Sequence, residues 1–138
     1  MIPQNLSHKP IVAVDNYDLI DGYNNGSDAK ALSIGKAQYD ENDISAKVFR
    51  RNDKKGIWSR QSEELPLHRC VDMCNLIVQS ILIAKGIKYD YSSYEVKPQI
   101  VDKNGFILLE DLFASDDFSN RLKDKLHDLY SLLSILKP

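Results

Sequence analysis

Apolar and polar residues alternate between Ile44 and Arg51, and this period of two predicts a strand. One side of that strand carries Ile44, Ala46 and Val48, and the other carries Ser45, Lys47 and Phe49. The turn-forming residues 52–56 come next, and residues 57–61 return as a partner strand. Because the turn between the two strands is tight, we expect them to pair in antiparallel fashion.

Two earlier segments extend this sheet. Residues 10–14 are a short β-branched run that predicts a strand, and the polar residues 1–9 before it are expected to form a flexible arm. Residues 28–39 allow two interpretations: a two-turn helix capped by Ser27 and ended by Gly35, or a strand over 32–39 with a bulge at Gly35. We favour the strand, which gives an antiparallel meander of about three strands.

The pattern then changes to a helical period. Pro66 suits a first helical turn, where its missing N–H is no loss, and Gly86 marks the end, so we predict a central apolar helix over about 66–85. Its wide apolar face indicates packing on more than one side. The residues of that face are Leu67, Cys70, Val71, Cys74, Ile77, Val78, Ile81 and Leu82.

The last third of the chain predicts a second long helix. Ser115 and the acidic residues after it favour a helix start, and leucines at helical spacing continue to Leu136, so we expect a helix over about 116–136. Before it, Asn104-Gly105 is typical of a short hairpin, although residues 106–113 also fit a helical turn. The fold class is therefore α+β, with residues 1–138 forming a single domain.

Composition narrows the classes of function. The chain has 138 residues, 28% of them charged, and a formal net charge of −2, so no overall basic field attracts nucleic acid or anionic membranes. We expect a cytoplasmic location, since the first residues show no signal peptide and the apolar run 76–84 is too short to span a bilayer. Cys70 and Cys74 share one helix face and are interpreted as buried apolar residues.

Charged and aromatic side chains gather around the start of the central helix. This candidate cluster consists of Trp58, Arg60, Glu63, Glu64, His68, Arg69 and Asp72. Opposite charges at this density form either an ion-pair network that ties the last strand to the helix or a pocket for a charged ligand. We favour the network, because no glycine-rich phosphate loop accompanies the cluster.

A narrow polar stripe also follows the central helix at positions i, i+4, i+7 and i+11. It consists of His68, Asp72, Asn75 and Gln79. One hypothesis is a site in which His68 acts as a base or metal ligand oriented by Asp72. The alternatives are a solvent-facing stripe or polar anchors for neighbouring loops. The stripe lacks the second histidine and the glutamate of the HExxH zinc pattern, and we predict no metal and no cofactor.

The predicted hairpin between residues 47 and 60 is basic and includes two aromatic side chains. Its candidate nucleic-acid surface consists of Lys47, Arg50, Arg51, Lys54 and Lys55. A basic hairpin with aromatic residues is one way to contact nucleic acid. The whole chain is acidic, however, and Glu63 and Glu64 follow immediately, so we regard nucleic acid as an unfavoured partner.

The segment from Trp58 to Arg69, together with Asp72 and the earlier run 45–50, resembles an uncharacterised family of small bacterial proteins. The matching segment reads W-S-R-Q-S-E-E-x-P-x-H-R, and the resemblance spans roughly residues 28–85. It implies a bacterial cytoplasmic protein and supplies no activity. It also draws attention to the candidate cluster as a unit.

The leading functional hypothesis from sequence is a small cytoplasmic interaction or accessory protein without catalysis. The reason is that no complete nucleophile, metal or phosphate constellation is present. The alternatives are an enzyme or small-ligand-binding protein that uses the cluster between Arg60 and Asp72, and nucleic-acid binding through the hairpin 47–60. Because both long helices are very apolar, we also expect a homodimer through helix faces, and no membrane association.

Overall fold

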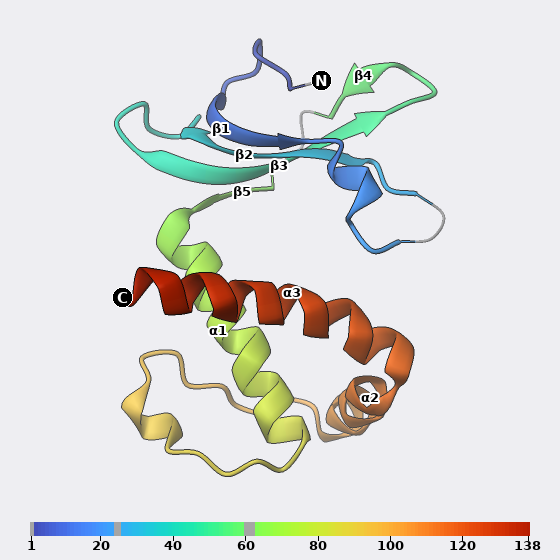
Figure 1. Ribbon diagram of the computed structural model, residues 1–138, viewed down its shortest axis with the longest axis vertical. Helices are drawn as coiled ribbons and strands as arrows, with labels where there is room; N and C mark the ends of the chain where they lie inside the picture. The colour runs from blue at the N-terminus through green and yellow to red at the C-terminus, as the bar shows by residue number, and fades with distance from the viewer. Residues whose placement is uncertain (1, 24–25, 60–62) are drawn as a thin grey trace. The chain divides into compact units, whose positions relative to one another are not determined.

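The computed structural model describes residues 2–23, 26–59 and 63–138, and the chain divides into two compact units, Met1–Met73 and Cys74–Pro138 (Figure 1). The described strands all lie in the first unit, and the second unit is helical. The α+β class predicted from the sequence is therefore confirmed.

The sheet is antiparallel and has more strands than the predicted three. Its strands are β1 (Lys9–Asp15), β2 (Ala29–Lys36), β3 (Ile44–Asn52), β4 (Ile57–Trp58) and β5 (Glu63–Pro66). The order is β1-β2-β3-β4, and β5 also pairs with β3. The nine-residue β3 accommodates both short strands because they use different parts of it: Arg51 and Asn52 pair with β4, and residues 45–48 pair with β5.

The strand interpretation of residues 28–39 is confirmed, but the bulge predicted at Gly35 is wrong. Gly35 lies in register with both Pro10 and Ser45, and the register shifts lie elsewhere, between Pro10 and Val12 and between Ala29 and Ala31. The glycine is needed for a different reason. A Cβ atom at Gly35 would lie 2.0 Å from the backbone oxygen of Lys9, so only glycine lets β1 approach β2 this closely.

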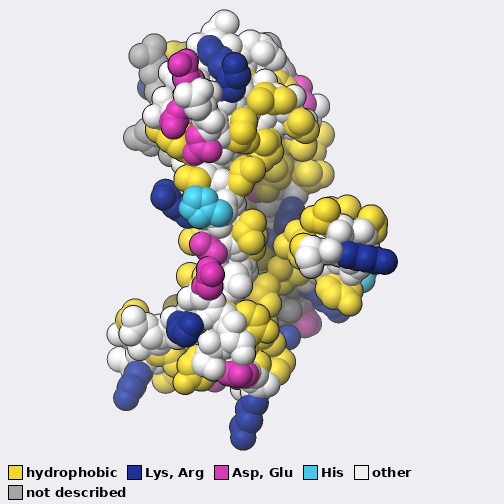
Figure 2. Space-filling view, turned by 90° about the vertical axis from the view of Figure 1, so that its left-hand side faces the viewer, with side chains coloured by type: hydrophobic (Ala, Val, Ile, Leu, Met, Phe, Trp, Pro, Cys, Tyr) yellow, Lys and Arg dark blue, Asp and Glu magenta, His cyan; other side chains and the backbone are white. Residues whose placement is uncertain are grey.

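The two faces of the sheet differ in how exposed their side chains are. We call the face formed by Ala29, Ala31, Ser33, Ser45, Lys47 and Phe49 the covered face, since all six residues are buried. We call the opposite side the apolar face; it carries Val12, Val14, Leu32, Ile34, Ala46 and Val48, none of which is buried. Figure 2 shows hydrophobic side chains gathered on the surface of the sheet-bearing unit.

Two of the three described helices have nearly the predicted boundaries, and the third occupies a segment predicted to be a hairpin. The central helix α1 is Leu67–Ala84 and the last helix α3 is Asp116–Leu136. The hairpin predicted around Asn104-Gly105 is wrong, because helix α2 occupies Lys103–Ala114. The Asp102 side chain accepts a hydrogen bond from the Asn104 backbone N–H at 3.1 Å, so the residues that suggested a turn form the capped start of a helix.

A polar anchor holds the loop after α1 within the second unit. The buried Gln79 side chain donates to the Val96 carbonyl at 2.8 Å and to Asn75, and it accepts a hydrogen bond from the Tyr89 hydroxyl at 2.6 Å. Gln79 thus fixes a loop that has a single short 3-10 turn, Tyr91–Ser93. Every bond to a buried amide of this kind offsets the cost of removing it from water.

Helix α1 is also the one helix in the described parts of the chain that is long and apolar enough to cross a membrane by length and composition. The core helix of a soluble protein meets the same criterion. The run 76–84, which we had considered too short, is thus the end of an 18-residue helix.

Candidate functional site

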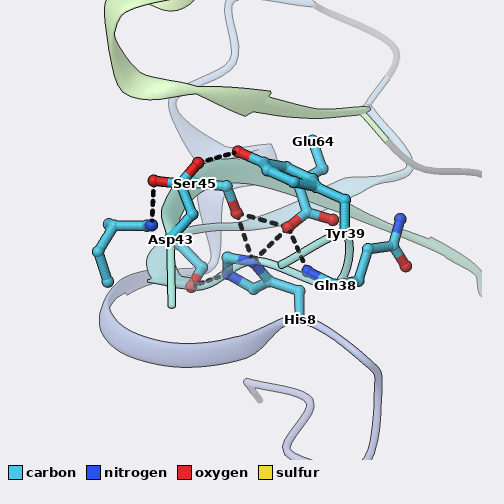
Figure 3. Close-up of polar contacts among 8 residues, drawn as sticks. His8, Gln38, Tyr39, Asp43, Ser45 and Glu64 are labelled. Atoms are coloured by element: carbon cyan, nitrogen blue, oxygen red, sulfur yellow. Dashed lines mark hydrogen bonds and ion pairs between the residues drawn. The ribbon is translucent and has the colours of Figure 1, made fainter. Parts of the chain in front are cut away.

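A buried polar group in the described part of the sheet unit is centred on His8, and we call it the His8 cluster (Figure 3). His8 Nδ1 lies 3.0 Å from Ser45 Oγ and 3.2 Å from Glu64 Oε1, and its Nε2 lies 2.9 Å from Ser33 Oγ. Glu64 Oε1 accepts two further hydrogen bonds, from the Ser45 hydroxyl at 2.5 Å and from the Gln38 backbone N–H at 2.9 Å. The cluster therefore connects four separate parts of the chain.

The sheet register brings these side chains together. Ser33 on β2 and Ser45 on β3 both lie on the covered face, because Ser45 pairs with Gly35, and Ser33 lies two residues from Gly35 on the same strand and so shares its face. Glu64 comes from β5, which pairs with β3. His8 immediately precedes β1, and its ring packs edge-on against Phe49 with the ring centres 5.7 Å apart.

The hydrogen bonds assign the imidazole proton. The Ser45 hydroxyl has one proton and donates it to Glu64, so it accepts from His8. Nδ1 therefore carries a proton, which it shares between Ser45 and Glu64. The Ser33 hydroxyl lies 2.9 Å from Nε2, so the second ring nitrogen also has a hydrogen-bond partner.

The environment of Glu64 favours its ionised form. Burial raises the pKa of the carboxyl group, but the hydrogen bonds from Ser45, from the Gln38 backbone and from His8 lower it more, so the pKa lies below its usual value. The side chain is only 2% exposed. Its second oxygen, Oε2, is buried and has no hydrogen-bond partner among the described residues, which leaves part of the desolvation cost uncompensated.

The His8 cluster has the atom order of a serine–histidine–acid triad, from Ser33 through His8 to Glu64. Access argues against catalysis, however. Ser33 is 4% exposed, and His8 and Ser45 are fully buried, so a substrate carbonyl reaches the hydroxyl only if the covered face opens. What the arrangement does is join the N-terminal stretch to β2, β3 and β5. Residues 1–9, which the sequence predicts to be a flexible arm, include two buried residues, Pro3 and His8.

The predicted candidate cluster is divided between strands and helix. Trp58 packs edge-on against Phe49 at 6.0 Å, and the Arg51 guanidinium lies 5.5 Å from the Trp58 ring centre. Glu63 pairs with Arg50, and Glu64 belongs to the His8 cluster. Arg60 lies outside the described residues. The remaining three members, His68, Arg69 and Asp72, are exposed in the first turns of α1.

The polar stripe on α1 likewise divides. Its first two residues, His68 and Asp72, are exposed, whereas Asn75 and Gln79 anchor the loop that contains Val96. The described residues contain no group of three or more histidine, cysteine, aspartate or glutamate side chains that would hold a metal ion. The prediction that both cysteines are buried is wrong for Cys74, which is exposed, while Cys70 is half-buried.

The basic residues of the hairpin are mostly engaged within the protein. Lys47 is buried on the covered face, with its Nζ 5.1 Å from the Phe49 ring centre. Arg50 bonds Asp28 at 2.6 Å as well as Glu63, and Arg51 stacks on Trp58. Lys54 and Lys55 in the turn are exposed to solvent. The surface offered to a nucleic acid is thus smaller than the sequence suggests.

A second candidate site lies on the apolar face. A groove of about 430 Å³ crosses β1, β2, β3 and β5, and carbon atoms dominate its lining. The lining includes Val12, Val14, Leu32, Ile34, Ala46, Val48 and Leu65. Val12 is 67% exposed. Sequence reasoning recognised the alternation that creates this row on β3 but did not identify the row as a surface.

Comparison with families of known proteins gives a match over nearly the whole chain. A family model described as "Family of unknown function (DUF6530)" matches residues 1–134. No curated protein matches the chain. No solved structure matches it either.

Proposed function

The chain belongs to this family of unknown function, and we propose a role for it on structural grounds: it is a non-catalytic interaction protein of the bacterial cytoplasm. Its apolar face is the docking surface, and the occupant is a partner polypeptide that presents a row of apolar side chains. The most developed polar arrangement, the His8 cluster, supports this reading because it is buried inside the sheet unit and is used to hold strands together.

The observation that carries the proposal is the exposure of the apolar face. Contiguous exposed apolar surface marks interaction sites in soluble proteins, whereas single exposed apolar residues are normal. Here the groove residues form a continuous row across four strands, and Val12, Val14 and Ile34 are each exposed. Burial of that row by a partner removes apolar surface from water and so supplies binding free energy.

The form of the groove favours a polypeptide over a small metabolite. Small-molecule sites combine apolar walls with a few convergent polar groups that fix the ligand's orientation. Of the two charged residues that line this groove, Lys47 directs its side chain to the covered face, over the Phe49 ring, and Glu63 pairs with Arg50. The groove therefore offers area without orienting groups, which suits the apolar side of a helix or strand.

Site-specific photocrosslinking tests the proposal. We expect p-benzoylphenylalanine at Ile34, on the apolar face, to give a discrete adduct with another polypeptide in native cells. The same probe at Ile57, an exposed residue of β4 outside the groove, serves as the matched control. No adduct at position 34, equal adducts at both positions, or a product made only of two copies of this chain would each contradict the proposal.

The purified partner then allows a quantitative test. Leu32→Lys places a charge in the middle of the groove, and we expect it to weaken binding at least tenfold by calorimetry. Ile57→Lys adds the same charge off the groove and is expected to leave the affinity unchanged. Ser33→Ala, which alters the covered face, is expected to have no effect on binding either. Equal affinities for the Leu32→Lys variant and the wild type would refute docking on this face.

A further inference from the structure

Lys47 and Glu64 carry opposite charges on adjacent strands of the covered face, yet they do not bond each other. Lys47 on β3 lies in register with Glu64 on β5, so the two side chains share a face. Glu64 Oε2 is buried and has no hydrogen-bond partner among the described residues. Lys47 is 5% exposed, and within the described parts of the chain its ammonium group forms no ion pair and lies over the Phe49 ring. A carboxylate oxygen and a lysine amine are thus both incompletely bonded on neighbouring strands.

The position of His8 explains why the two groups stay apart. Ser45, Lys47 and Phe49 are successive residues of the covered face on β3. The His8 ring bonds the first of them, Ser45, and packs edge-on against the third, Phe49 (Figure 3). The ring therefore lies over the position between them, which is that of Lys47. It also lies 3.2 Å from Glu64 Oε1, so the imidazole stands between the lysine amine and the carboxylate.

The attachment of residues 2–8 to the sheet depends on the same histidine. Among the described residues, His8 makes every hydrogen bond between residues 2–8 and the strands β2, β3 and β5. The stretch itself forms no helix or strand. A segment held by so few hydrogen bonds opens locally at a lower free energy than the strands on which it lies.

We propose that residues 2–8 are a latch with two states. In the closed state, described above, His8 bonds Glu64 and Lys47 lies over the Phe49 ring. In the open state His8 withdraws into solvent, and the Lys47 ammonium group turns to the Glu64 carboxylate. Residues directly opposite each other on antiparallel strands have Cβ atoms about 4.5–5.5 Å apart, so the lysine side chain spans the distance. Opening uncovers the side of the Phe49 ring that His8 covers, and the sheet stays folded.

The exchange of partners lowers the free energy needed to open the latch. Withdrawal of His8 alone leaves a buried carboxylate without one of its donors, which is costly. Lys47 supplies a donor together with an opposite charge, and hydrogen bonds between charged groups are the stronger kind. The two states therefore differ by less than the loss of the His8 contacts implies, as a two-state device requires. The latch belongs to the covered face and does not depend on docking at the apolar face.

A crystal structure of the His8→Ala variant tests the exchange directly. Removal of the imidazole imitates the open state and leaves the rest of the chain unchanged. We expect the Lys47 ammonium group to lie within hydrogen-bond distance of a Glu64 carboxylate oxygen. A lysine that remains over the Phe49 ring, with no bond to Glu64, would overturn the proposal.

Thiol labelling measures how often the latch opens while the His8 cluster is intact. In a Cys70→Ser/Cys74→Ser background, Pro3→Cys places a thiol at a buried position of the latch, so its reaction with a thiol reagent requires opening. We expect Lys47→Met to slow this reaction at least tenfold, because the open state loses its ion pair. Lys54→Met removes an exposed lysine of the turn after β3 and is the control, with an unchanged rate. An equal or faster reaction in the Lys47→Met variant would refute the exchange.

Urea separates opening of the latch from unfolding of the sheet. Local opening exposes little surface, so we expect the labelling rate at position 3 to change little at low urea concentrations. A rate that rises with urea as steeply as global unfolding does would show that residues 2–8 leave the sheet only when it unfolds. That result would rule out a separate open state.

A double-mutant cycle tests the same pair of residues without labelling. We expect Lys47→Met to lower the urea midpoint slightly in the wild type and about twice as far or more in the His8→Ala background, where the lysine takes the place of the imidazole. A lysine that serves only by its contact with the Phe49 ring gives equal decreases in the two backgrounds. Equal decreases, or a smaller one with His8→Ala, would contradict the latch.

Discussion

The two faces of the sheet reverse the usual distribution of residue types, in which apolar side chains are buried and polar side chains are exposed. The covered face includes histidine, lysine and two serines, yet it is buried, and the apolar face is rich in valine, leucine and isoleucine, yet it is open. The covered face is stable because its polar groups are bonded to one another around His8. The polar contacts that join the strands thus lie on the covered face, and the apolar face is the one that we propose as a docking surface.

The largest expected effect concerns the aromatic centre of the covered face. Phe49 is 1% exposed and contacts the rings of His8 and Trp58. Phe49→Ala is expected to lower the free energy of unfolding by about 3–5 kcal/mol, because it removes a buried ring and leaves a cavity. Leu32→Ala, on the apolar face, is the matched control with a much smaller loss. Urea denaturation measures both; comparable losses would show that the two faces contribute equally.

The second largest expected effect is the loss of stability on removing the His8 side chain. His8→Ala removes partners from Ser33, Ser45 and Glu64 at once, and the expected loss is about 3 kcal/mol because a buried carboxylate loses a donor. His127→Ala changes an exposed histidine of α3 and is expected to be neutral within about 0.5 kcal/mol. Thermal and urea denaturation provide the measurement. A neutral His8→Ala variant would mean that the N-terminal stretch is not held by this cluster.

The smallest of the three effects is a pH dependence. Since the pKa of Glu64 is lowered in the folded protein, its contribution is fully present above the unfolded pKa and is lost as the pH falls through the folded pKa. Glu64→Gln is expected to cost about 1–2 kcal/mol at pH 7, and the difference from the wild type should shrink below about pH 4.5. Urea denaturation at pH 7, 5, 4 and 3 measures it; a difference that stays constant with pH would contradict the assignment.

The sequence predicted those helices and strands that depend on interactions between residues close together in the chain. The bounds of α1 and α3 follow from helical periodicity and terminal residues, and β3 follows from strict alternation. The error at Asn104-Gly105 has a local cause as well, since Asp102 offered a helix cap that competes with the turn. At Gly35 the bulge was misplaced, because the close approach of Lys9 involves a residue 26 positions earlier in the chain.

The candidate site was less predictable. Glu63, Glu64 and Trp58 were recognised as an organised group, but their partners are Arg50, His8 and Phe49, which come from other strands. His8 carried no signal in the sequence, since a single histidine in a polar stretch has no periodicity to indicate burial. Its contacts with Ser33 and Ser45 span 25 and 37 residues, and only the sheet register brings them within reach.

The sequence by itself determined the α+β class, the two long helices and the alternation of β3, because period and capping are properties of neighbouring residues. Alternation indicates that a strand has one apolar and one polar face, but it does not indicate which of the two faces the rest of the chain will bury. Only the tertiary structure decided that, by placing His8 over Ser33, Ser45 and Phe49 and leaving Val12, Leu32 and Val48 in the open groove. The deciding contacts are long-range, and their energy depends on satisfying buried polar groups rather than on the hydrophobicity of any single strand.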